Sequence, residues 1–166
     1  MNIQKTWIRE LGPGEFAVLD AVFAGLSPAS RFTRFHAGVP RLVPAVRNTL
    51  AAVDGRRHIA VAAYVDDEPI GIARLIAVRD RPADIAVEVV DRWQGHGVGT
   101  QLVLDVVERA REAGHTVVEA EIMAENRAVR RLIERIFPEA TATVDHTEIT
   151  YRGDLSHRRR EETSAA

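Results

Sequence analysis

Cysteine is missing from this chain of 166 residues. Without a thiol the chain forms no disulfide, thiolate zinc site or iron–sulfur cluster, and a cysteine nucleophile is excluded. No run of about 18 apolar residues occurs, so no membrane-spanning helix is expected. The start of the chain lacks a basic region followed by an apolar one, so we expect no signal peptide and a cytoplasmic location.

A large excess of charge of either sign is also missing. The 22 basic and 24 acidic residues give a net charge of −2, so no general basic field favours nucleic acid as a partner. The six histidines show no metal-ligand spacing such as His-x-x-x-His, and we therefore expect no bound metal. Apolar residues at 46% and charged residues at 28% are ordinary for a folded globular protein.

The length predicts one domain, since a domain averages about 150 residues. We assign this domain to residues 1–155 and expect a disordered tail over 156–166, where charges cluster and apolar side chains are scarce. Apolar periodicity distinguishes strands from helices within the domain. The predicted strands are 7–11, 58–65, 70–78, 84–90, 117–122, 140–144 and 147–152, and the predicted helices are 15–26, 28–35, 42–53, 98–113 and 127–136.

The order of these elements is β, α, α, α, β, β, β, α, β, α, β, β. Helices and strands are mixed but do not alternate strictly, which argues against a βα barrel and against a doubly wound dinucleotide fold. We predict an α/β domain with one central mixed sheet, mostly antiparallel, flanked by helices.

A glycine-rich loop lies between a predicted strand and a predicted helix, at 95–99. The first N–H groups of a helix lack internal partners, and glycines let a phosphate approach the backbone closely. A Walker loop is excluded because no lysine follows Gly99. A dinucleotide fingerprint is excluded because Thr100 stands where its third glycine or alanine belongs. The alternative is a plain tight turn.

Three further features of the sequence belong together: the motif Gln94-x-x-Gly97-x-Gly99 after 89–93, the Asn-containing segment 125–132, and the segments 12–14 and 26–35. Together they resemble the GNAT superfamily of N-acetyltransferases. The first third is similar to the catalytic domains of bacterial protein lysine acetyltransferases, and the resemblance covers roughly residues 5–153. It implies a single GNAT-like domain.

The resemblance implies acetyl-CoA as co-substrate. The main-chain N–H groups of 96–100 would hold its pyrophosphate, and the backbone of 87–89 would pair with the pantetheine amides. Val89 N–H would polarise the thioester carbonyl. Asn126 would bind the pantetheine end, although asparagine also favours an ordinary helix N-cap. The expected cofactor-binding residues are Val87, Val89, Gln94, Gly95, His96, Gly97, Val98, Gly99, Thr100 and Asn126.

Two carboxylates precede the loop on one strand, Asp84 and Glu88. An ammonium group must lose its proton before it can attack a thioester, so either carboxylate is a candidate general base. The lysine acetyltransferases usually carry Glu where this chain has Asp84. The alternatives are a solvated face or an ion pair with an arginine such as Arg74. Ile133 replaces a tyrosine that serves as general acid in many GNAT enzymes.

We interpret the chain as an N-acetyltransferase that moves an acetyl group from acetyl-CoA to a primary amine by direct attack in a ternary complex. A protein lysine is the favoured acceptor. One alternative is a small-molecule amine acetyltransferase, and another is a non-catalytic sensor of acyl-CoA. The partners implied are therefore an amine acceptor, with no nucleic acid and no membrane, and the oligomeric state is open.

Overall fold

The computed structural model describes residues 5–156. The predicted tail therefore lies, from residue 157 onward, outside the described residues. The seven strands are β1 (Thr6–Glu10), β2 (His58–Val65), β3 (Glu68–Ile76), β4 (Ala83–Val89), β5 (Val117–Met123), β6 (Thr141–Asp145) and β7 (Glu148–Asp154). The helices are α1 (Phe16–Ala24), α2 (Pro28–Phe35), α3 (Pro44–Ala51), α4 (Val98–Glu112) and α5 (Arg127–Ile136), with a short 3₁₀ turn, η1 (Asp91–Trp93).

All seven strands belong to one sheet in the order β1-β2-β3-β4-β5-β7-β6. Every neighbouring pair is antiparallel except β4 and β5, which run parallel. The predicted mixed, mostly antiparallel sheet is therefore confirmed. The chain crosses from β4 to β5 through α4, as a parallel connection requires.

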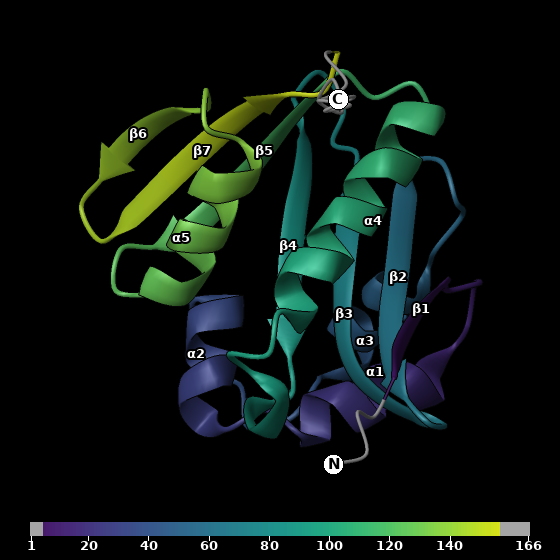
Figure 1. The fold of residues 1–166 in the computed structure, drawn as a ribbon. Helices are drawn as coiled ribbons and strands as arrows, with labels where there is room; N and C mark the ends of the chain where they lie inside the picture. The colour runs from purple at the N-terminus through teal and green to yellow at the C-terminus, as the bar shows by residue number, and fades with distance from the viewer. Residues whose placement is uncertain (1–4, 157–166) are drawn as a thin grey trace, which may run out of the picture.

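Helices cover both faces of the sheet (Figure 1). On one face α4 lies across β2 and β3 and contacts α5, and the apolar side chains of both helices join the larger core. On the other face α1 packs on β3 and α3, and a second core forms around Val22, Ile72 and Leu50. The two cores have the strand alternation expected of a sheet buried on both sides.

The parallel strands β4 and β5 separate soon after they meet. Their pairing is limited to Ala83 with Val118 and Asp84 with Glu119. Beyond these residues the strands diverge, β4 staying with β3 and β5 staying with β7 (Figure 1). A wedge-shaped opening in the middle of the sheet results, and α2 lies against both of its strands.

The predicted order of elements is confirmed, and several boundaries agree to the residue, such as those of α2 and α5. The third helix is shorter than predicted because Pro44 occupies its first turn and Val43 is its N-cap. The 3₁₀ turn η1 was not predicted, since three residues carry no periodic signal. Among residues 5–156 no helix combines the length and the apolar character needed to cross a membrane.

Candidate active site

A cavity of about 870 Å³ occupies the opening between β4 and β5. Its walls come from α2, β4, the glycine-rich loop, the first turn of α4, β5 and α5. Nine of the ten expected cofactor-binding residues line it; the exception is His96, which is exposed and packs its ring edge-on against Trp93 at 5.8 Å. The glycine-rich motif thus lies at the same cavity that the separation of β4 and β5 creates.

The glycine-rich loop leads directly into α4. Gly97 is the helix N-cap with φ of 81°, and Gly95 has φ of 77°. Both conformations favour glycine, and a Cβ at either position would meet no atom within 4 Å. Within residues 5–156 no side chain caps α4, so the N–H groups of its first turn remain available to a ligand. Gln94 fixes the loop, since its Nε2 donates to Val89 O at 3.0 Å.

The edge of β4 beyond Asp84 faces the cavity instead of another strand. Val90 N–H donates to Ile70 O at 2.9 Å, toward β3. Backbone groups of successive strand residues point alternately to the two sides. The N–H groups of Val87 and Val89 therefore point away from β3 and into the opening, as the family resemblance implies.

Helix α5 forms the far wall of the cavity. Asn126 caps this helix, because its side-chain oxygen accepts from Val129 N–H at 3.3 Å, and it also lines the cavity. The capping role predicted as an alternative is thus present. Arg135 of the same helix lines the cavity too and places Nη2 3.5 Å from Thr100 Oγ1. Its positive charge beside the first turn of α4 favours a phosphate there.

Glu88 belongs to a buried cluster of charged side chains with Arg34 and Arg74. Its carboxylate accepts from Arg34 Nε of α2 and lies 3.7 Å from Arg74 Nη2, and only 4% of the side chain is exposed. Arg74 also donates to Leu50 O at 2.8 Å. Burial lowers the pKa of Arg74, and the Glu88 carboxylate opposes that shift. Both carboxylate oxygens thus face guanidinium groups, so the predicted alternative of an ion pair with Arg74 is present.

Asp84 lies on the same face of β4 as Glu88, because the β3–β4 register has no bulge between them. Its surroundings are different. Burial by the cavity walls raises the pKa of Asp84, Arg81 opposes the shift, and the neighbouring Glu119 adds to it. Asp84 lines the cavity and keeps contact with water. A carboxylate with a raised pKa is a stronger proton acceptor than an ordinary one.

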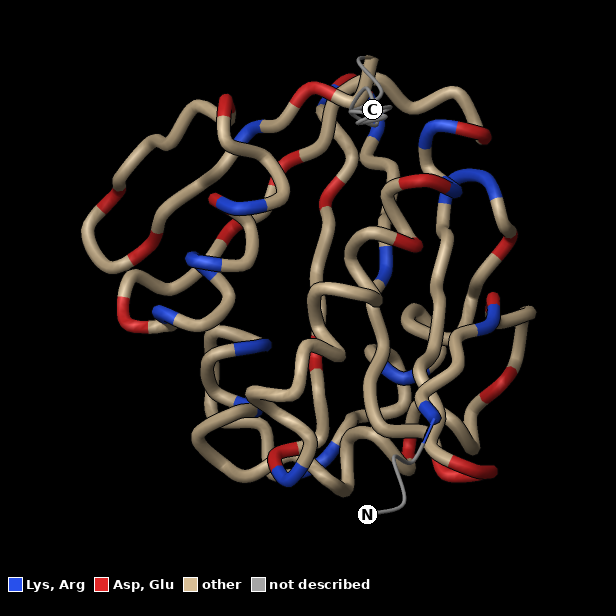
Figure 2. Tube along the Cα trace, viewed as in Figure 1, with Lys and Arg blue, Asp and Glu red and all other residues tan. Residues whose placement is uncertain are grey.

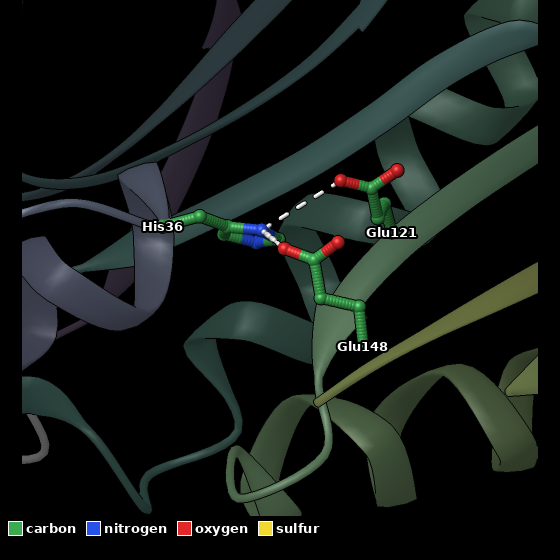
Figure 3. Close-up of side chains that lie close together, drawn as sticks. All are labelled: His36, Glu121 and Glu148. Carbon is green, nitrogen blue, oxygen red and sulfur yellow. Dashed lines mark hydrogen bonds and ion pairs between the residues drawn. The ribbon is translucent and has the colours of Figure 1, made fainter. Parts of the chain in front are cut away.

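Further acidic residues gather around the opening. Figure 2 shows acidic residues along both β4 and β5. Glu121 of β5 and Glu148 of β7 line the cavity, and both point toward His36, the C-cap of α2 (Figure 3). His36 Nδ1 lies 2.6 Å from Glu148 Oε1 and 3.7 Å from Glu121 Oε1. This end of the cavity therefore carries a concentration of negative charge.

Sequence reasoning did not place Arg34, His36, Arg135 and Glu148 at the site. His36 and Glu148 are 112 residues apart in the chain, and no local spacing signals such a contact. The sequence places Arg34 only within the family-like segment 26–35, whereas in the structure it forms an ion pair with the buried Glu88. Arg135 lies on α5, which the sequence predicts from an apolar stripe. That stripe does not indicate what the charged face of the helix contacts.

The position of the missing general acid is apolar. Ile133 is 3% exposed and lies in the core. The only tyrosines, Tyr64 and Tyr151, are both strand residues, as predicted. Tyr151 O–H donates to Glu134 at 2.6 Å. Neither tyrosine lines the cavity.

A model of the Acetyltransferase (GNAT) family matches residues 22–137. The chain belongs to this family of acetyltransferases. Acetyltransferase PA5475 of Pseudomonas aeruginosa is 30% identical over 112 residues, which make up 64% of this chain and 60% of that protein. The matched region thus spans less than two thirds of the relative's length.

Solved structures with the same fold have more distant sequences. The GNAT domain of S. lividans PAT superimposes with a TM-score of 0.79 at 22% identity, covering 89% of both chains. The acetyltransferase yncA of Salmonella typhimurium, solved with its cofactor acetyl-CoA, gives 0.66 at 18% identity, covering 95% of this chain and 98% of that one. The single GNAT fold predicted from the sequence is therefore confirmed.

Proposed function

We propose that this protein transfers an acetyl group from acetyl-CoA to a primary amine, with a protein lysine as the favoured acceptor. The observation that carries the proposal is the juxtaposition of a free strand edge, an uncapped helix N-terminus and a cavity carboxylate with a raised pKa. The first two suit a thioester cofactor with a pyrophosphate, and the third suits proton removal from an ammonium group.

Acetyl-CoA would be held mainly by the main chain. Its pyrophosphate would accept from the N–H groups of 96–100, where the helix dipole adds positive potential. Its pantetheine arm would lie between β4 and β5, pairing with the free N–H groups of Val87 and Val89 and reaching Asn126. The yncA structure, which contains acetyl-CoA, supports this choice of cofactor.

The acceptor amine would enter from the face of the sheet that carries Asp84. Glu121 and Glu148 line that entrance and Glu119 lies opposite Asp84 on β5, so a lysine ammonium group gains a favourable electrostatic potential as it approaches. A neutral or anionic acceptor gains no such potential. The acidic entrance therefore supports a cationic amine as substrate.

The chemical step is a direct transfer. Asp84, or a water molecule hydrogen-bonded to it, takes a proton from the ammonium group, and the freed lone pair attacks the thioester carbonyl carbon. Val89 N–H stabilises the negative charge that develops on the carbonyl oxygen. The tetrahedral intermediate collapses as the carbon–sulfur bond breaks, and the nitrogen gives up its second proton to water or to the departing sulfur, leaving an amide and CoA. No cysteine exists to carry the acetyl group in between.

Glu88 is the weaker candidate for the base. Its two oxygens are engaged by Arg34 and Arg74, and an incoming amine would have to displace a guanidinium group to reach them. We assign it a positioning role: it fixes α2, through Arg34, against β4.

A turnover assay tests this function. Released CoA thiol can be measured directly, because the chain has no cysteine that would react with a thiol reagent. We expect turnover with a lysine peptide and acetyl-CoA, at a higher kcat/KM than with free small amines, and acetylated peptide in the mass spectrum. Turnover of small amines alone would reject the lysine acceptor. Binding of acetyl-CoA without any turnover would reject the enzyme.

A further inference from the structure

His36, Glu121 and Glu148 come from three separate elements and meet at one point (Figure 3). Glu121 and Glu148 lie diagonally on the paired strands β5 and β7, where Glu121 is opposite Thr150, and they project from the same face. His36 follows α2 in a left-handed conformation with φ of 56°, which turns its side chain across to both carboxylates. The fold thus directs one imidazole nitrogen at two carboxylate groups.

We propose that these three side chains bind a divalent transition-metal ion of the zinc class. Imidazole nitrogen and carboxylate oxygen are both zinc ligands, and three protein ligands with one open position are an established arrangement for this ion. The three ligand atoms lie within 4.8 Å of one another. Zinc holds such ligands at about 2.0–2.2 Å, which requires ligand atoms about 3.3–3.6 Å apart in a tetrahedron.

The distances fit this requirement after a small adjustment. His36 Nδ1 and Glu121 Oε1 are 3.7 Å apart, already close to the tetrahedral spacing. His36 Nδ1 and Glu148 Oε1 are 2.6 Å apart, the distance of a hydrogen bond when Nδ1 carries the proton. The ion would replace that proton, and the two atoms would separate by less than about 1 Å. The carboxylates are 58% and 37% exposed, so their rotamers can adjust and the ion can enter from solvent.

The charge of the cluster also favours a divalent cation. The cluster has two carboxylates and one imidazole. Among the described residues, Glu121 and Glu148 each form an ion pair with His36. Glu119, two residues from Glu121 on the same face of β5, has Arg152 Nη1 at 3.9 Å. Glu119 is therefore partly neutralised, which makes it a matched control rather than a ligand.

Occupation of this site would oppose acetyl transfer. The ion would neutralise Glu121 and Glu148 at the entrance expected to attract the amine, so it would act as an inhibitor competitive with the acceptor. This consequence rests on the proposed function, whereas binding of the ion does not.

Calorimetric titration of Zn²⁺ into the metal-free chain tests the binding. We expect one ion per chain and at least a tenfold loss of affinity in His36→Ala, Glu121→Gln and Glu148→Gln. Glu119→Gln and His146→Ala should keep the wild-type affinity; His146 pairs with Asp145 in a second, exposed histidine–carboxylate contact. Mg²⁺ should bind far more weakly, because it prefers six oxygen ligands to an imidazole nitrogen.

Equal affinity of the wild type and His36→Ala, or equal binding of Zn²⁺ and Mg²⁺, would overturn the metal site, whether or not the protein transfers acetyl groups. Circular dichroism of each variant would identify any that is unfolded, and the two glutamine variants, at exposed positions, then keep the test decisive. In turnover assays we expect Zn²⁺ to raise KM for the amine without changing KM for acetyl-CoA. An unchanged KM for the amine would overturn the inhibitory role alone.

Discussion

The two sides of the β4–β5 opening offer a ligand different kinds of chemical group. The α4 side offers main-chain N–H groups, glycines and apolar side chains such as Val98 and Leu132. The α2 side offers charged side chains, among them Asp84, Glu88 and His36. Main-chain recognition suits a cofactor that is the same in every reaction, whereas side chains can be exchanged without disturbing the fold. We therefore expect acceptor identity to be set on the α2 side.

Asp84 and Glu88 extend the comparison to two residues of one strand. Both are carboxylates on the same face of β4, four residues apart. Glu88 is buried between two guanidinium groups, whereas within residues 5–156 no arginine forms an ion pair with Asp84, whose pKa is raised by burial. The proposed assignment of Asp84 as the base and Glu88 as a positioning residue therefore rests on environment rather than on residue type.

The largest expected effect is on catalysis by Asp84→Asn. Removing the general base should lower kcat/KM at neutral pH by about 10²–10⁴-fold. The deficit should shrink as pH rises toward the pKa of the amine, since free amine then forms without help. Acetyl-CoA affinity, measured by calorimetry, should stay unchanged because the cofactor contacts lie elsewhere. A variant with near-full activity at pH 7 would remove Asp84 from the mechanism.

Glu88→Gln should instead damage the fold. Arg74, 3% exposed, would then keep a buried charge without its partner carboxylate. Breaking such a pair costs about 3–5 kcal/mol, which urea unfolding at pH 7 would measure. Retention of wild-type stability together with a loss of turnover as large as that of Asp84→Asn would reverse the two assignments.

Gly97→Asp should abolish cofactor binding on the α4 side. The substitution places a β-carbon at φ of 81° and a negative charge where the pyrophosphate should lie. At 100 times Kd, acetyl-CoA should stabilise the wild type by about 2.7 kcal/mol, and this increment should vanish in the variant. Gly14→Asp is the control, because Gly14 has φ of 78° and open space but lies away from the cavity. If acetyl-CoA stabilised neither Gly97→Asp nor Gly14→Asp, the loss could not be assigned to the glycine-rich loop.

The smallest expected effect is a gain in stability from Asp84→Asn. The folded state raises the pKa of Asp84 above its unfolded value of about 3.9, so ionisation costs stability as pH rises through that window. The variant should match the wild type near pH 3 and melt slightly higher at pH 7. Because the side chain is partly in water, we expect a gain below about 1 kcal/mol. A lower melting temperature at pH 7 would contradict the raised pKa.

Local sequence signals predicted the fold and the place of the glycine-rich loop before α4. Strand alternation, helical stripes and capping residues act over a few neighbours, which is why α2 begins at Pro28 as predicted, with Ser27 as its N-cap. The loop is equally local: Gly95 and Gly97 lie just before α4, and both have the positive φ of the turn that leads into the helix.

The acceptor side could not be predicted to the same depth. His36 meets Glu148 only because α2 packs against β4 and β5, and because β7 inserts between β5 and β6. Arg34 reaches Glu88 across 54 residues of sequence for the same reason. These contacts depend on tertiary packing, which no periodicity encodes. The place of Asp84 and Glu88 on β4 follows from local sequence, but the pairing of Glu88 with Arg34 and Arg74 depends on tertiary packing.

A crystal structure of the protein with acetyl-CoA bound tests the central claim most directly. We expect the pyrophosphate within hydrogen-bond distance of the main-chain N–H groups of 96–100, the pantetheine arm between β4 and β5, and the thioester carbonyl facing Val89 N–H. The Asp84 carboxylate should face the acetyl group from the α2 side, with Glu88 still paired to Arg34 and Arg74. Acetyl-CoA bound outside the opening, or a Glu88 carboxylate released from its arginines and turned to the thioester, would contradict the account.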